Sequence, residues 1–228
     1  MDKRIEKSDQ WGKVRGELER EELKARTYDE AVHNLLFQLW VQTDATVLDY
    51  GSGAGVFTSL LKRLGMKPKA FDISSEMRAA TAERIGADNV FTQIEDIPEA
   101  AFDVVVCNLV LCIVDDTMAA YIMKRIQKLL RPRGIAIVGF CNPEIFQVHE
   151  TKLDIRYPVG ESYGESHVYL KIKKEGNYEI AEHHRPLGWY SILFWIAGFR
   201  TKRIVFTPEY ELNNQPISDF AIFALQKR

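Results

Sequence analysis

The chain has 228 residues, of which 46% are apolar, enough to bury the core of one domain, whereas two full domains would be cramped. Its 30 basic and 32 acidic residues give a formal net charge of -2, which is not a field that would attract a polyanion or an anionic membrane surface. We therefore expect neither a nucleic acid nor a membrane as a partner.

The three cysteines, Cys107, Cys112 and Cys141, lie within or beside apolar stretches and show no CxxC spacing. A disulfide framework or a zinc site is therefore not expected, and we predict reduced, buried thiols in a cytoplasmic protein. The longest apolar stretch, residues 104–114, is well short of the roughly 18 residues of a membrane span. The polar amino terminus does not have the pattern of a secretory signal.

Residues 1–44 predict a helical cap made of two helices. The first, near residues 12–26, is mostly charged. The second has one apolar face, formed by Val32, Leu35, Leu36, Leu39 and Trp40.

Residues 45–142 alternate between strand and helix patterns. Strands are predicted, in chain order, at ATVLDY, KAFDI, NVFTQI, FDVVVCNLV and IAIVGF. The helices between them show apolar faces, the clearest being Phe57, Leu60, Leu61 and Leu64, and Met118, Ile122, Ile126, Leu129 and Leu130. Such alternation implies a parallel sheet with right-handed crossovers.

Residues 143–185 interrupt this alternation. HVYLKIK and NYEIAEHH alternate apolar and polar residues around Lys174–Asn177, which predicts a small antiparallel insertion after the fifth strand, interpreted as a lid. Residues 186–228 predict a helix with Trp189, Ile192, Leu193, Ile196 and Ala197 on one face, followed by the strands RTKRIVFT and DFAIFALQ. Their connection is too short for a crossover helix, so these strands should pair antiparallel.

Three glycines lie between the first predicted strand of residues 45–142, ATVLDY, and the helix that follows it. They are part of VLDYGSGAGVFTSLL at residues 47–61. A glycine loop at this place brings backbone amides close to a ligand at the amino end of a helix. The dinucleotide fingerprint requires a glycine where Val56 stands, and the phosphate loop of nucleotide hydrolases requires Gly-Lys-Ser/Thr where Gly55-Val56-Phe57 stands. Both phosphate-binding interpretations are therefore disfavoured.

Asp49, Gly51, Gly53 and Gly55 form Asp-x-Gly-x-Gly-x-Gly instead, which resembles the class I S-adenosylmethionine-dependent methyltransferases. The likeness extends from about residue 45 to the carboxyl end. With the patterns above, it predicts a single α/β domain over residues 1–228. Its parts are a doubly wound, mostly parallel, seven-stranded Rossmann-like sheet with an antiparallel last strand, the helical cap and the lid insertion.

The resemblance implies how the cofactor is held. The glycine turn would face its amino acid part, and Asp49 would meet its ammonium group, because a carboxylate suits a cation and would repel a pyrophosphate. Asp72, about 20 residues after the glycines, would accept hydrogen bonds from both ribose hydroxyls. Ile73 and Met77 look like the residues that flank the adenine ring, with ordinary core packing as the alternative.

A third segment, TQIEDIP, resembles the part of the family that follows the third strand, with Gln93 where an Asp is common. Adenine would then be recognised by the amide oxygen of Gln93 and by the backbone of Ile94 and Glu95.

At the end of the fourth strand, the resemblance implies that Asn108 and Leu109 lie against the methionine moiety. Tyr28 is similar to aromatic residues that close over the cofactor in relatives with helical caps.

Methyl transfer is an in-line displacement that requires no metal, so the sequence need not show a catalytic constellation. A hydroxyl acceptor usually needs a base, and the candidates in the insertion are His149, His167, His183 and His184. His184 is favoured and His183 comes second, in a segment similar to the His-Arg-Pro region of small-molecule methyltransferases. Alternation places them on opposite faces of a strand, so at most one should face the cleft. A structural histidine is the alternative, and no carboxylate stands at a spacing that would complete a metal site.

The methyl acceptor is expected to be a small organic molecule, methylated on nitrogen or oxygen. The fourth strand ends in Asn108-Leu109-Val110-Leu111, without the Asn/Asp-Pro-Pro-Tyr/Phe of enzymes that act on nucleobase or glutamine amides. The insertion is rich in aromatic residues such as Phe146, Tyr157 and Tyr163, and Trp195 falls off the apolar face of its helix, as a pocket residue or an oligomer contact would. A monomer or homodimer is expected.

Two other functions remain open from the sequence. One is a regulatory or interaction module that binds S-adenosylmethionine without transferring its methyl group. The other is an RNA or peptide methyltransferase that relies on a partner for recognition.

Overall fold

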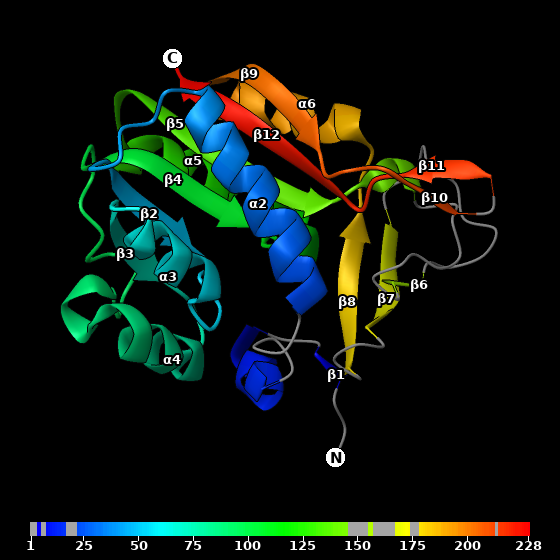
Figure 1. The fold of residues 1–228 in the computed structure, drawn as a ribbon, viewed down its shortest axis with the longest axis horizontal. Coiled ribbons are helices and arrows are strands. Elements are labelled where there is room, and N and C mark those ends of the chain that lie inside the picture. The colour runs from blue at the N-terminus through cyan, green and yellow to red at the C-terminus, as the bar shows by residue number, and fades with distance from the viewer. Residues whose placement is uncertain are drawn as a thin grey trace.

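A mixed sheet of six strands, in the order β3-β2-β4-β5-β12-β9, forms the centre of the molecule (Figure 1). The computed structural model describes residues 4–5, 8–16, 22–145, 155–156, 167–173, 178–212 and 214–228. The strands of this sheet are β2 (Thr46–Tyr50), β3 (Lys67–Phe71), β4 (Phe102–Asn108), β5 (Leu130–Cys141), β9 (Phe199–Phe206) and β12 (Phe220–Lys227). The first four run parallel, and β12 runs antiparallel to both β5 and β9.

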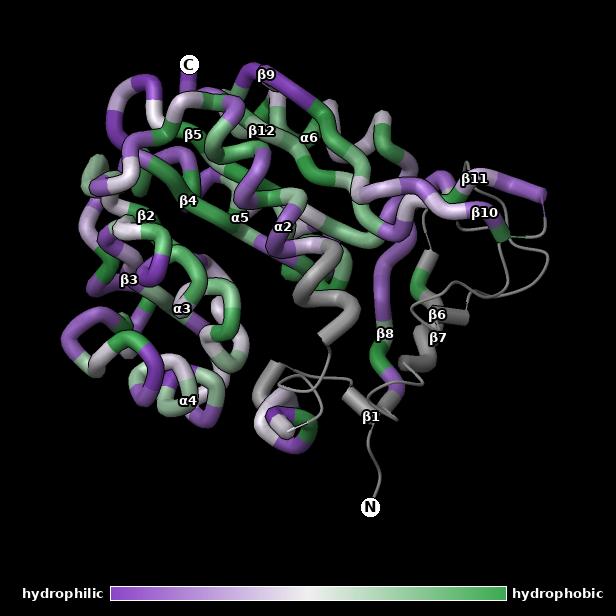
Figure 2. Tube along the Cα trace, viewed as in Figure 1, coloured by the Kyte–Doolittle hydropathy of each residue, from purple (hydrophilic) through white to green (hydrophobic). Residues whose placement is uncertain are grey.

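Helices cover both faces of the sheet. On one face lie α2 (Glu22–Gln38) and α3 (Val56–Arg63), and on the other lie α5 (Asp116–Leu129) and α6 (Leu187–Ile196). Along β4, Val104 and Val106 pack toward the first pair of helices, whereas Val105 packs toward the second pair. This double burial explains the continuous apolar run of β4, which Figure 2 shows together with that of β5.

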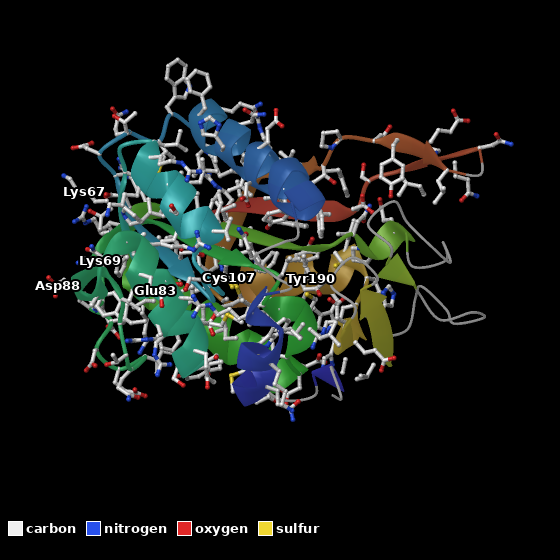
Figure 3. All side chains as sticks on the ribbon, turned by 60° about the horizontal axis from the view of Figure 1, so that its bottom comes forward. Lys67, Lys69, Glu83, Asp88, Cys107 and Tyr190 are labelled. Carbon is white, nitrogen blue, oxygen red and sulfur yellow. The ribbon has the colours of Figure 1, made fainter. Side chains whose placement is uncertain are left out.

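The interior and the outer edge of the sheet differ in the side chains they carry. Cys107 on β4 and Tyr190 on α6 are buried, whereas Lys67 on β3 is exposed, as Figure 3 shows. The helix α4 (Ser75–Ile85) follows β3 and packs against α3. Its Ser74 cap accepts a hydrogen bond from the amide of Met77, which fixes where the helix begins.

The strand predicted at residues 89–94 does not form, so the described sheet has six strands and not seven. Val90 makes one isolated bridge to Ala70, and the amide of Phe91 donates to the Ala70 oxygen at 2.9 Å. The following residues, Thr92 and Gln93, are exposed and polar, so nothing holds them against the edge of the sheet.

A second sheet contains the insertion, in the strand order β1-β8-β7-β6. Its strands are β1 (Arg4–Ile5), β6 (Ile155–Arg156), β7 (His167–Lys173) and β8 (Tyr178–His184). The antiparallel pairing of β7 with β8 confirms the predicted hairpin, although its turn, Phe146, Tyr157 and Tyr163 lie outside the described residues. The parallel pairing of β1 with β8 was not predicted, and it joins the amino-terminal segment to the insertion.

The remaining described elements are short. A β-ribbon of β10 (Tyr210–Leu212) and β11 (Gln215–Ile217) lies between β9 and β12. The 3-10 helices are η1 (Ser8–Val14), η2 (Ala87–Asn89), η3 (Leu111–Ile113) and η4 (Pro143–Ile145).

Two helical predictions were wrong in detail, and a third falls partly outside the described residues. The helix predicted near residues 12–26 lies partly outside the described residues, in which η1 ends at Val14 and α2 begins at Glu22. Trp40 comes after α2 with a φ of 56° and is 85% exposed, so it leaves the apolar face. The helix α6 is apolar on all sides, so its sequence did not define one inner face. The structure buries Tyr190, Leu193, Phe194 and Ala197, and leaves Ile192, Trp195 and Ile196 exposed.

Candidate functional site

The predicted cofactor residues gather at the carboxyl ends of the parallel strands. The strand order reverses between β2 and β4, since β3 lies beyond β2 and β5 lies beyond β4. In open α/β sheets, ligands bind in the crevice at such a reversal. Asp49 near the end of β2, Asp72 just after β3 and Asn108 at the end of β4 all lie at this edge.

The glycine loop follows β2 and is shaped by close contacts. A Cβ added to Gly51, whose φ is 82°, would lie 2.3 Å from Cγ2 of Val110. A Cβ added to Gly55, whose φ is 76°, would lie 2.8 Å from Thr81. Gly53 also has a positive φ, 52°, but no heavy atom lies within 4 Å of the place its Cβ would take. The loop therefore has an open side at Gly53, where a ligand can approach the backbone.

Asp72 is 8% exposed and is fixed by its hydrogen bonds to the loop. The amide of Gly53 donates to Oδ2 at 2.8 Å, and the amide of Ser74 donates to Oδ1 at 2.9 Å. Burial raises the pKa of Asp72, and these two hydrogen bonds oppose the rise. Each carboxylate oxygen keeps a second lone pair, so Asp72 can still accept from a pair of hydroxyls.

Asp49 is 2% exposed and lies behind the glycine loop. The hydroxyl of Thr58 donates to its Oδ2 at 2.5 Å. Burial raises the pKa of Asp49 to about 7, the Thr58 hydrogen bond lowers it, and the charges of Asp29 and Asp72 raise it further. A cation arriving at this carboxylate would favour its charged form.

The residues expected around adenine are less uniform. Ile73 is 64% exposed, and Gln93 and Glu95 are exposed as well. The backbone oxygen of Ile94 accepts a hydrogen bond from Arg125 at 3.1 Å. Met77 is 1% exposed and packs with Ala54 and Ala80, which favours the core packing left open as its alternative.

Tyr28 of α2 reaches the end of β4. It is 3% exposed, and its hydroxyl donates to Oδ1 of Asn108 at 2.5 Å. Burial raises the pKa of Tyr28 above its ordinary value. Next to Asn108, Leu109 has a φ of 57°, and its amide donates to the Gly139 oxygen at 2.8 Å. These hydrogen bonds hold together the helical cap and the ends of β4 and β5.

A small pocket lies where β5 ends and β8 meets α6. It is lined by Cys112, Cys141, Asn142, Pro143, Glu182, His183, His184, Arg185 and Tyr190. His184 is 4% exposed, and His183 is partly buried, with its pKa lowered by burial and then by the Arg185 charge. Both histidines line this pocket at the end of β8, and which of them faces the cleft stays a prediction.

The sequence analysis assigned no role to Arg185, which is part of the His-Arg-Pro segment. In the structure it is 1% exposed and lines the same pocket. Its guanidinium donates to Asp116 at 2.7 Å and to the backbone oxygens of Leu111 and Val114 at 2.8 and 2.6 Å. It also lies 4.5 Å from the ring centre of Trp189. Arg185 therefore fixes the end of the hairpin to the loop that follows β4.

Sequence reasoning also missed Trp11 and Glu182. Trp11, in η1, packs against the cluster of Ala54, Met77 and Ala80 and against the cluster of Val14 and Ile180. Glu182 is 3% exposed in β8. In the sequence, Glu182 could have been found as a charged residue in an alternating strand directly before two histidines. Nothing in the local pattern around Trp11 pointed to a site.

The described residues contain neither a candidate metal site nor a helix that could span a membrane. No three of their His, Cys, Asp and Glu side chains are grouped so that they could hold a metal ion. No helix among them combines the length and the apolar character needed to cross a membrane.

The chain is similar to methyltransferases both in sequence and in structure. Over 74 residues, or 30% of this chain, the sequence is 36% identical to ribosomal protein L11 methyltransferase of Paraburkholderia phymatum, and the alignment covers 24% of that protein. An S-adenosylmethionine-dependent methyltransferase of Clostridium acetobutylicum superposes with a TM-score of 0.66 at 14% identity, over 95% of this chain and 97% of the other. A 1,6-didemethyltoxoflavin-N1-methyltransferase of Burkholderia thailandensis, with 1,6-didemethyltoxoflavin and S-adenosylhomocysteine bound, superposes with a TM-score of 0.57 at 18% identity, over 100% of this chain and 93% of the other.

A sequence profile described as a methyltransferase domain matches residues 20–169, which is more than half of the chain. The matched range contains the glycine loop, Asp49, Asp72 and the end of β4. The chain therefore belongs to the methyltransferase domain family, as a class I S-adenosylmethionine-dependent methyltransferase.

Proposed function

We propose that this methyltransferase moves a methyl group to a nitrogen or oxygen atom of a small organic molecule. The observation that carries the proposal is the small pocket at the end of β5, which the insertion hairpin and α6 close from the side. The pocket has room only for a water-sized group, so no more than a small part of an acceptor could enter it. The balanced charge of the chain, and the small-molecule acceptor of the B. thailandensis protein that superposes along its whole length, support the same conclusion.

The residues at the strand ends fit the cofactor. Gly53 would let its amino acid part approach the backbone, Asp49 would meet its ammonium group, and Asp72 would accept from its ribose hydroxyls. Ile73, Met77, Gln93, Ile94 and Glu95 stay candidates for the adenine end. S-adenosylmethionine, when bound, supplies a methyl group activated on a positively charged sulfur.

The work of the protein in this reaction is positioning and exclusion of water. Tyr28 and Asn108 hold the cap over the end of β4, and Arg185 holds the hairpin beside it. His184 is the candidate base for a hydroxyl acceptor, with His183 second. A neutral amine acceptor would need neither histidine as a base.

The cofactor assignment is tested by Asp72→Ala. We expect its affinity for S-adenosylhomocysteine, measured by calorimetry, to fall by about a hundredfold, because two charge-assisted hydrogen bonds to the ribose would be lost. The matched control is Asp103→Asn, since Asp103 also accepts a backbone amide, from Thr46 at 2.9 Å, but lies at the opposite end of β4. Unchanged affinity in Asp72→Ala would remove this residue from the ribose site.

The acceptor class is tested with methyl-labelled S-adenosylmethionine and an extract of the source organism. We expect label in the small-molecule fraction of the wild-type reaction. Label found only in protein or RNA would favour a macromolecular acceptor, the second candidate, which the partial likeness to ribosomal protein L11 methyltransferase supports. Label that never leaves the donor would contradict both and favour a binding module.

A further inference from the structure

We propose that the edge of the large sheet at β9 binds a second copy of this chain, and that the two β9 strands pair antiparallel around a twofold axis. The inference does not depend on the methyl acceptor, and it narrows the expected monomer or homodimer to a homodimer with one geometry. β9 is the last strand in the order β3-β2-β4-β5-β12-β9, so within the described part of the chain one side of its backbone has no neighbouring strand (Figure 1). Such an edge offers amides and carbonyls that can pair with another chain.

The two edges of this sheet differ in their protection against pairing. The opposite edge is β3, a strand of five residues that include Lys67, Pro68 and Lys69. Lysine and proline on a short edge strand discourage pairing with another chain. β9 has eight residues and no proline, and the register shift in its pairing with β12 lies before Arg203, which leaves a regular stretch up to Phe206. Of the two edges, β9 is therefore the better suited to accept a partner strand.

Large apolar side chains are exposed along the β9 edge. Ile204 and Phe206 are exposed, and they pair with Phe223 and Ala221 of β12, which belong to the core cluster on the α6 side of the sheet. Residues that lie opposite each other in an antiparallel pair share one face, so Ile204 and Phe206 lie on the face that α6 covers. The helix α6 packs against β9 and exposes three more large apolar side chains, Ile192, Trp195 and Ile196. Apolar side chains gathered beside an open strand are typical of an interaction site.

The charges along this edge are divided between its two ends. Three exposed basic residues lie in the first half of β9: Arg200, Lys202 and Arg203. Two exposed acids, Glu209 and Glu211, follow the strand, where the β10–β11 ribbon extends beyond the end of β9 (Figure 1). Among the described residues, none of these five side chains takes part in an ion pair. The edge thus has a basic half and an acidic half, with apolar residues between them.

This division of charge favours a second copy as the partner. Two identical edges that meet antiparallel around a twofold axis place the basic half of each against the acidic half of the other. When Val205 of one copy lies opposite Phe206 of the other, the spacing brings Lys202 of each copy near Glu209 of the other. Opposite charges across a strand pair stabilise it, whereas a parallel pair would place basic against basic. Basic residues alone would protect the edge, but together with the acids they make it self-complementary.

The same geometry assigns a contact to α6. In a continuous sheet the twofold axis is perpendicular to the strands' plane, so the α6 helices of both copies lie on the same side of the new strand pair. Trp195 is exposed and does not belong to the lining of the small pocket, which favours the oligomer contact among its two expected roles. The strands β5 and β12 separate β9 from β4, so the crevice between β2 and β4 stays open in the dimer.

The oligomeric state is tested by sedimentation velocity on the full chain over a dilution series. We expect a species of twice the 26.2 kDa of one chain that dissociates on dilution. A monomer at every concentration would overturn the inference, and so would assemblies that grow beyond two copies. Neither result would touch the proposed function, which is measured by methyl transfer.

The charge pattern is tested by Lys202→Glu, with Lys67→Glu on the opposite edge as the matched control. We expect the dimer dissociation constant to rise by about tenfold in Lys202→Glu, because the like charges meet twice in a twofold dimer. The double variant Lys202→Glu with Glu209→Lys exchanges the two charges and should restore the wild-type constant, while Lys67→Glu should not change it. An unchanged constant in Lys202→Glu, or no restoration in the double variant, would overturn the antiparallel pairing.

The apolar part of the edge is tested by Ile204→Asp. We expect this variant to remain monomeric at concentrations where wild type is a dimer, because a charge would be buried between the two strands. Its affinity for S-adenosylhomocysteine, measured by calorimetry, should equal that of wild type, which shows that the fold and the cofactor site are intact. A dimer of wild-type strength in Ile204→Asp would show that the contact lies on another surface and would overturn the inference.

Discussion

Asp49 is a buried acid whose surroundings favour its protonated form in the absence of a ligand. Burial raises its pKa to about 7, above the value of about 4 that an unfolded chain gives an aspartate. Between these two values the folded state binds a proton that the unfolded state has released, so stability should fall as pH rises from about 4 to about 7. The full span corresponds to roughly 4 kcal/mol.

We therefore predict that the free energy of unfolding of the ligand-free protein decreases over this pH range, measured by denaturant titration. Asp49→Asn, which cannot titrate, should show a smaller decrease. The ammonium of S-adenosylhomocysteine needs the charged carboxylate, so affinity should increase as pH rises through about 7 in wild type only. The same pH slope of affinity in Asp49→Asn would contradict the assignment of Asp49 to the ammonium.

At the scale of elements, α2 is fixed to the sheet through one close approach. The ring of Tyr28 lies over Gly139, where an added Cβ would fall 1.5 Å from the tyrosine oxygen. The same ring packs edge-on against Phe220 at 5.2 Å. A glycine inside a strand usually weakens it, and here Gly139, near the end of β5, makes room for the residue that connects the cap to Asn108.

We predict that Gly139→Ala destabilises the protein by about 2 kcal/mol, in the range typical of overpacked sites, because Tyr28 must move. The cost should be smaller in a Tyr28→Ala background, so the two changes should be non-additive in thermal unfolding. Gly188→Ala is the control, since an added Cβ there meets no atom within 4 Å. Equal costs of Gly139→Ala in both backgrounds would show that Tyr28 is not the group displaced.

The elements also show where sequence patterns are informative. The run of β4 was predictable because it is continuously apolar, and the faces of α2 and α3 were predictable because their apolar residues recur at helical spacing. The segment 89–94 has strand composition but too few apolar residues to stay on the sheet edge, and α6 has apolar residues on every side. Local periodicity cannot resolve such cases, since the neighbours in space decide them.

Over the whole molecule, the places of Asp49 and the glycines followed from one local motif, and that of Asp72 followed from the end of the next strand. Glu182 and Trp11 did not, because each acquires its neighbours through long-range pairing. The pairing of β1 with β8 brings the first residues of the chain beside a hairpin from its last third, as Figure 1 shows. No spacing within the sequence encodes that contact.

Trp11 connects the two sides of the molecule that this pairing brings together. It packs against a cluster from the glycine loop and α4, which includes Ala54 and Met77, and against a cluster that joins Val14 to Ile180 of the hairpin. Close by, Arg15 and Glu83 of α4 form an ion pair at 2.8 Å, but both side chains are substantially exposed. Apolar contacts of a large ring should contribute more than such a surface pair.

We predict that Trp11→Ala speeds amide hydrogen exchange in both α4 and β8, because one side chain supports both elements. The opening free energy of these amides should fall by about 2 kcal/mol. Arg15→Ala should change the same amides by less than about 1 kcal/mol. S-adenosylhomocysteine should slow exchange in α4 and β8 together in wild type, and in α4 alone in Trp11→Ala. If β8 still responds to the ligand without the indole ring, then the coupling between cofactor site and hairpin runs through Arg185 and the loop after β4 instead.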